Sequence, residues 1–126
     1  MSQINIKHIT SLNSESLKGL EFFEQELGFL QGRLNEIAAD YTGKEVSEKI
    51  EHFQNQFVIH SNAIDELKHL IHSNKKNMEA QLVKSDVFVD VDTADEHQKL
   101  NEQYLTEEKM FNELHHEFNH FAAEWM

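Results

Sequence analysis

The 126-residue sequence contains no cysteine and no proline. Without cysteine the chain has no disulfide, no thiol nucleophile and no thiolate metal site. Proline breaks helices because it lacks an amide hydrogen and its ring clashes with the preceding turn. Glycine, the other common helix breaker, occurs only four times. A chain so poor in both residues is free to form long helices.

Basic residues are also scarce, with 11 Lys and Arg against 23 Asp and Glu and a formal net charge of −12. Non-specific binding to nucleic acid and to anionic membranes depends on basic clusters. The densest basic run is Lys75-Lys76, so we expect no nucleic acid and no membrane as a partner. The charge is compatible with an unidentified basic protein partner.

Long apolar runs are missing as well. The first residues lack the apolar stretch of roughly 7–15 residues that marks a signal peptide. No stretch of about 18 apolar residues is present that could span a membrane. We therefore expect a cytoplasmic protein, and its length predicts a single domain over residues 1–126.

Apolar residues recur every three or four positions, which places them on one face of an α-helix. Asn13, Thr42 and Thr93 are potential N-cap residues. We expect helices near residues 13–40, 44–84 and 95–124. In the second segment the apolar seam passes through positions 46, 50, 53, 57, 60, 64, 67 and 71, with steps of four and three as in a coiled coil.

These segments predict an all-α fold, an elongated antiparallel helical hairpin or three-helix bundle with one long central helix. We expect the apolar link "SDVFVDVDT" (85–93) to pack over the bundle end as a loop. The polar stretch "HSNKKN" (72–77) leaves two alternatives, a solvated part of a continuous helix or a kink or break.

The expected helix lengths place the first helix against residues 44–71 of the second and the third helix against residues 56–85. This stagger leaves apolar seam that needs a cover. The N-terminal segment could supply one part of the cover, and a second copy of the chain the rest. The stagger is a first argument for homodimerisation.

A second argument comes from Gly28 and Gly32, four residues apart inside the first predicted helix. Each costs about 1 kcal/mol relative to alanine. They lie roughly opposite the seam, with Phe22 and Phe29 beside them. Since small residues at this spacing let helices approach closely, we expect these four residues to form a self-association stripe of an isologous dimer. The alternative is that both phenylalanines edge an apolar arc facing the third helix.

Nine histidines raise an alternative function, a metal-binding bundle of the di-iron, oxygen-carrier or metal-storage type. "ELKH" (66–69) and "ELHH" (113–116) have the Glu-x-x-His spacing of di-iron bundles, but both face away from the seams. We therefore expect no metal centre and no cofactor. The residues of the alternative are His60, His116 and His120, of which the last two, one turn apart, could chelate Zn²⁺ or Ni²⁺ at the surface.

His60 occupies a seam position. We expect a core histidine whose ring meets a glutamate or a carbonyl; the alternative is a pH-sensitive element whose protonation near about pH 6 loosens the bundle. Glu107 also lies on a seam, and we place it level with Asn74 in a polar layer that specifies register.

Catalytic motifs are not evident, because the paired glycines lie inside a helix and no turn presents a nucleophile. We therefore expect a non-enzymatic interaction or scaffold protein that self-associates. Its working surfaces would be the stripe and the acidic faces of the second and third helices.

Overall fold

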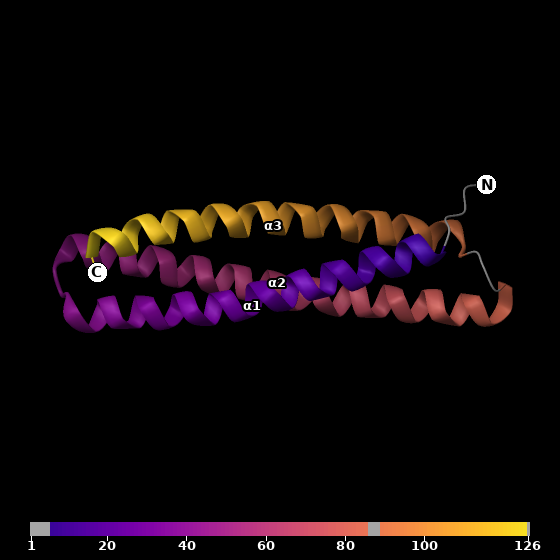
Figure 1. The fold of residues 1–126 in the computed structure, drawn as a ribbon, viewed down its shortest axis with the longest axis horizontal. Helices are drawn as coiled ribbons and strands as arrows, with labels where there is room; N and C mark the ends of the chain where they lie inside the picture. The colour runs from indigo at the N-terminus through magenta and orange to yellow at the C-terminus, as the bar shows by residue number, and fades with distance from the viewer. Residues whose placement is uncertain (1–5, 86–88, 126) are drawn as a thin grey trace.

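A computed structural model describes residues 6–85 and 89–125. It contains helices α1 (Ile6–Asp40), α2 (Lys44–Ser85) and α3 (Val91–Trp125). The helices lie side by side in a rod (Figure 1). The α1–α2 turn and the end of α3 share one end of the rod, so α1 and α3 run parallel to each other and antiparallel to α2. An all-α bundle of three helices is therefore confirmed, and the described residues contain no strand.

One apolar cluster takes side chains from all three helices and occupies most of the rod. Within it the ring of Phe23 stacks on that of Phe111, with centroids 4.6 Å apart, and Phe53 meets Phe118 edge on at 5.2 Å. Burying such side chains is the main source of stability, at roughly 25 cal/mol per Å². Of the seam positions expected in the second helix, Ile50 is only partly buried and the others are buried: Val46, Phe53, Phe57, His60, Ile64, Leu67 and Ile71. The buried apolar residues of α1 in this cluster are Leu20, Phe23, Leu27, Leu30, Leu34 and Ile37.

The central helix α2 continues without a break through residues 72–77. Asn74 is buried and its Nδ2 donates a hydrogen bond to the backbone oxygen of Thr93 at 3.2 Å. The other five residues of this stretch are exposed. The continuous, solvated alternative is therefore confirmed, and the break is wrong. None of the helices in the described part of the chain is both long and apolar enough to cross a membrane.

The first helix begins earlier than expected, at Ile6 instead of near residue 13. Asn13 is not an N-cap, because it lies inside α1, where its Oδ1 is 3.2 Å from Nδ1 of His97 on α3. The added turns bring Ile9 against Met78 and Val89, in a second, small apolar cluster. Burial of Ile9 explains why the helix extends past its local cap signal, and the start of α1 covers this end of the bundle.

The third helix also begins earlier, at Val91, and its cap is Asp90 instead of Thr93. An Asp90 Oδ1 accepts a hydrogen bond from the backbone amide of Thr93 at 2.8 Å, and this bond lowers the pKa of the carboxyl. The Asp90 amide in turn donates to Oε1 of Gln81 at 2.7 Å. At Asp90 the chain therefore lies beside α2, and Val89 is buried there. Residues 86–88 of the expected loop lie outside the described residues, and residues 91–93 are helical, so the loop does not extend to residue 93.

This placement of Asp90 shifts α3 along α2. Glu107 lies beside His60, and Thr93 lies beside Asn74. The expected polar layer of Glu107 and Asn74 is therefore wrong, because the two residues belong to layers about four helical turns apart.

The expected stagger of the outer helices is also wrong. Contacts with α3 begin at Asn13 of α1, beside His97, and continue to Tyr41, the residue after α1. The ring centroids of Tyr41 and Trp125 are 5.3 Å apart. Both outer helices thus cover nearly the same length of α2, as Figure 1 shows. The reason is the early start of α1 and the return of the α2–α3 connection. Stagger therefore provides no argument for a second copy.

Candidate interaction surface on α1

The structure places all four residues of the predicted stripe at the surface of α1. Phe22 is 55% exposed and Phe29 is 68% exposed, and Gly28 and Gly32 are exposed as well. The Phe22 ring meets the edge of the buried Phe23 ring, with centroids 6.1 Å apart. The stripe is thus open to another molecule, and its self-association stays a prediction.

The four glycines differ in what surrounds them. A Cβ placed on Gly19 would overlap the phenol group of Tyr104 on α3, so the close contact of these helices explains this glycine. A Cβ on Gly28 or Gly32 would meet nothing within 4 Å. Packing within the chain therefore accounts for glycine at position 19 but not at 28 or 32.

Tyr104 fills the space that Gly19 leaves. Its ring stacks on Phe23 at 6.3 Å, and its hydroxyl donates to Glu108 at 3.2 Å. Burial, with the neighbouring Glu108, raises the pKa of Tyr104 to about 12, so the phenol stays neutral. Periodicity within one helix does not identify the residue opposite it on another helix, so this pair is not evident from the sequence.

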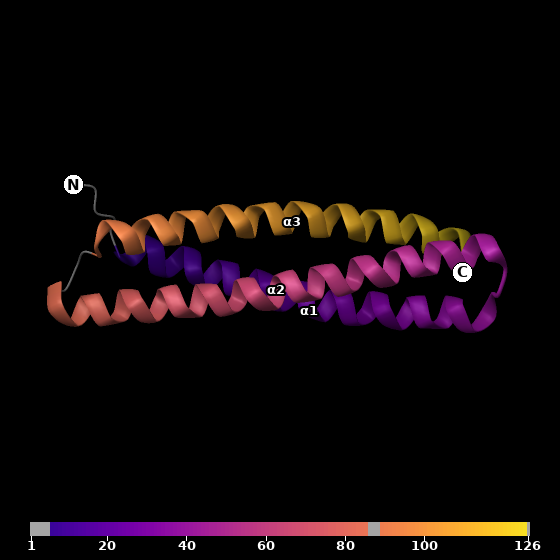
Figure 2. The same cartoon turned by 180° about the vertical axis from the view of Figure 1, so that it is seen from behind.

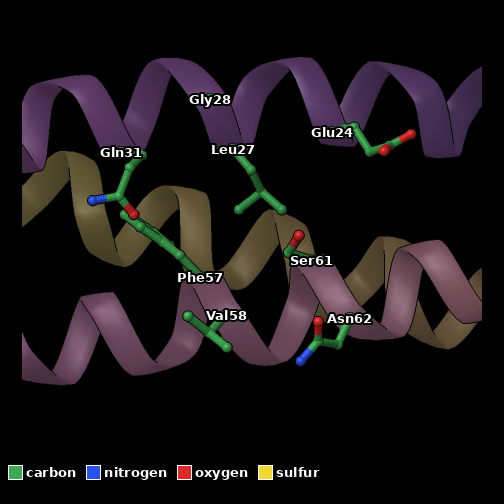
Figure 3. Close-up of a pocket in the computed structure, with 8 residues that line it drawn as sticks. All are labelled: Glu24, Leu27, Gly28, Gln31, Phe57, Val58, Ser61 and Asn62. Atoms are coloured by element: carbon green, nitrogen blue, oxygen red, sulfur yellow. The ribbon is translucent and has the colours of Figure 1, made fainter.

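A hollow of about 420 Å³ lies between α1 and α2 beside Gly28 (Figure 3). Leu27, Phe57 and Val58 supply its apolar surface, and Figure 3 shows the side chains of Leu27 and Phe57 in the space between the two helices. Because Gly28 has no side chain, the hollow stays open toward the stripe. Its remaining lining residues are polar: Glu24, Gln31, Ser61 and Asn62.

Polar contacts between α1 and α2 flank this hollow. Glu24 forms an ion pair with Lys68, and this bond raises the pKa of the lysine. Gln31 donates from Nε2 to Oε1 of Gln54 at 2.8 Å. These contacts hold the polar side chains at the edge of the hollow. Of its apolar residues, Val58 is half exposed, whereas Leu27 and Phe57 are buried.

The residues of the metal alternative do not come together. His60 is buried, and its Nδ1 lies 2.6 Å from Oε2 of Glu107. His116 and His120 are exposed on α3, with ring centroids 5.5 Å apart. Within residues 6–85 and 89–125, no three His, Asp or Glu side chains are arranged to hold a metal ion.

The neighbour of His60 agrees with the expectation of a core histidine that meets a glutamate. A second buried histidine, His97, was missed. It lies three residues before the buried Leu100 and so continues the seam spacing of α3, which is the signal that could have identified it. Burial, and to a smaller extent His8, lowers the pKa of His97.

Searches for similar proteins do not add a functional assignment. The chain matches no family model, no curated protein and no solved structure. The geometry of its own surfaces is therefore the basis for inferring what it does.

Proposed function

We propose that this protein is a non-enzymatic helical interaction or scaffold protein that self-associates through the stripe on α1. The observation that carries the proposal is the pair Gly28 and Gly32, for which packing within the chain offers no reason. Two phenylalanines, each more than half exposed, lie on the same helix. Exposed apolar side chains that cluster on one face are typical of interaction sites.

The partner that fits the stripe is a second copy of the chain. In an isologous dimer the same surface meets itself across a twofold axis, so one set of residues supplies both the projecting and the receiving parts. Phe29 projects, and the bare backbone at Gly28 and Gly32 can receive a phenyl ring. The apolar hollow next to Gly28 extends the receiving surface toward Phe57.

Substitution of both phenylalanines tests the proposal. We expect the wild-type chain to be a dimer in sedimentation equilibrium and the Phe22→Glu/Phe29→Glu variant to be a monomer with an unchanged helical circular dichroism spectrum. Both rings are exposed, so the added charges leave the core intact.

Val83→Glu/Leu105→Glu is the matched control, because it adds the same charge at exposed apolar residues of α2 and α3. This variant should stay dimeric. A wild-type chain that is monomeric at about 100 µM, where even a weak dimer of ordinary affinity is populated, would refute self-association. A stripe variant with the wild-type mass would refute the stripe as its surface.

A further inference from the structure

A second accessible groove is formed by α2 and α3 alone. It is a hollow of about 690 Å³ lined by residues of these two helices. Figure 2 shows how α2 and α3 run along the rod. Ala63, Leu67 and Leu70 provide its apolar surface on α2, at the spacing that aligns residues on one helix face. Met110 faces them from α3 and is 45% exposed.

Three of the four charged residues that line this groove are acidic. Glu66 of α2 and Glu102 of α3 are exposed, and Glu107 lies deeper, buried beside His60. Lys99 is the basic residue of the lining. The groove therefore combines an apolar floor with carboxylates contributed by both helices.

We propose that this groove docks an amphipathic helix of a partner protein that carries Lys or Arg along both edges of its apolar face. The apolar face would cover Leu67, Leu70 and Met110, and the basic residues would meet Glu66 and Glu102. Docking of one helix face into an apolar groove is a common mode of peptide recognition, and the product here is a four-helix bundle.

Charge decides between a foreign helix and a second copy of the chain. The chain has a formal net charge of −12, so two copies would bring acidic surfaces together at this groove. A basic helix gains attraction where an acidic one meets repulsion. The proposal does not depend on self-association, because the groove contains no residue of α1.

A designed peptide of about 18 residues provides the probe, with Leu at positions of one helix face and Lys on both sides of it. Binding to the full chain is followed by the methyl NMR signals of methionine. We expect a saturable shift of the Met110 methyl at micromolar peptide and no shift of Met78, which is buried in the small terminal cluster. A peptide with Glu in place of Lys, and a scrambled peptide of the same composition, should leave Met110 unshifted.

Leu70→Glu/Met110→Glu separates docking from general attraction between a cationic peptide and an acidic protein. The added charges strengthen general attraction but place carboxylates on the apolar floor, so we expect at least a tenfold loss of affinity. Val83→Glu/Leu105→Glu adds the same charge outside the groove and should retain wild-type affinity or exceed it.

Three results of the peptide experiment would overturn the proposal: equal binding of the scrambled peptide, equal loss of affinity in both variant pairs, or a Met110 methyl that does not shift. A change in the mass of Leu70→Glu/Met110→Glu without peptide would make a second copy the occupant and overturn it as well.

Discussion

His60 of α2 and Glu107 of α3 form a hydrogen-bonded pair in the core, with side-chain exposures of 4% and 8%. Removing one member of a buried hydrogen-bonded pair leaves the polar group of the other unsatisfied, whereas replacing both with apolar residues can be nearly neutral. We therefore expect His60→Leu to lower the free energy of unfolding by about 1–3 kcal/mol. His60→Leu/Glu107→Leu should recover most of this loss in urea denaturation at neutral pH.

A double variant no more stable than His60→Leu would show that the two side chains are not coupled. The pH-sensitive alternative for His60 stays a prediction.

We expect His97 to make the stability of the folded protein depend on pH. Burial and, to a smaller extent, His8 lower the pKa of this histidine. A histidine in the unfolded chain has a pKa of about 6.5, so as the pH falls the unfolded chain binds a proton at this residue before the folded protein does. Stability is therefore highest above that pH and declines below it, until the folded protein also binds the proton. Between about pH 7.5 and pH 5.5, the wild-type chain should lose more stability than His97→Gln.

The comparison uses urea denaturation of both proteins at each pH, because other histidines titrate in the same range. Asn13 of α1 contacts the ring of His97, and His8, also on α1, is the titratable residue that interacts with His97 electrostatically. Identical slopes of stability against pH in the two proteins would contradict the assignment to His97.

Alanine substitutions at the glycines of α1 should have opposite effects on the free energy of unfolding. Gly19→Ala should lower the free energy of unfolding, because the added methyl overlaps the Tyr104 phenol and overpacking costs about 1–3 kcal/mol. Gly28→Ala and Gly32→Ala should each raise it by up to about 1 kcal/mol, because alanine favours the helix and meets nothing nearby.

These variants are best compared in the Phe22→Glu/Phe29→Glu background, in which association through the stripe does not add to stability. Tyr104→Phe removes the atom that lies nearest the added methyl and should restore part of the stability lost in Gly19→Ala. A stabilising Gly19→Ala would show that Tyr104 moves aside without cost.

The cap of α3 is a further test of the fold. Asp90→Ala removes the acceptor for the Thr93 amide, so the thermal midpoint should fall, whereas Asp90→Asn keeps an acceptor and should lose less. Because the same bond lowers the pKa of Asp90, its contribution is present at neutral pH and is lost as the pH falls through the folded-state pKa. Equal midpoints for the wild type and Asp90→Ala, measured by circular dichroism, would contradict the assigned cap.

Local sequence was sufficient to predict the helices and most of their buried faces. Periodicity assigned Phe53, Phe57 and Leu67 to the core, because a helix with 3.6 residues per turn brings residues three and four apart to one side. The short turn after Asp40 made α1 and α2 antiparallel neighbours. The sequence left the two phenylalanines of the stripe either exposed or facing the third helix, and the structure shows them exposed.

Tertiary contacts decided where α1 and α3 begin. Asn13 and Thr93 are both suited to capping, and taken alone each marks a helix start. In the folded chain they lie inside helices, where Asn13 contacts His97 and Thr93 contacts Asn74. A contact from another helix replaces the local hydrogen bond, and such a contact is not encoded in the residues next to the cap.

Tertiary structure alone also decided the register of α3 along α2. Glu107 lies beside His60 instead of Asn74, a residue fourteen positions later in α2. A displacement of fourteen residues is two seven-residue repeats, so every seam residue stays on the seam and periodicity is the same in both registers. The sequence therefore determined which face of each helix is buried. The offset was decided by Val89 packing against Ile9 and Met78, and by the return of the chain that this burial requires.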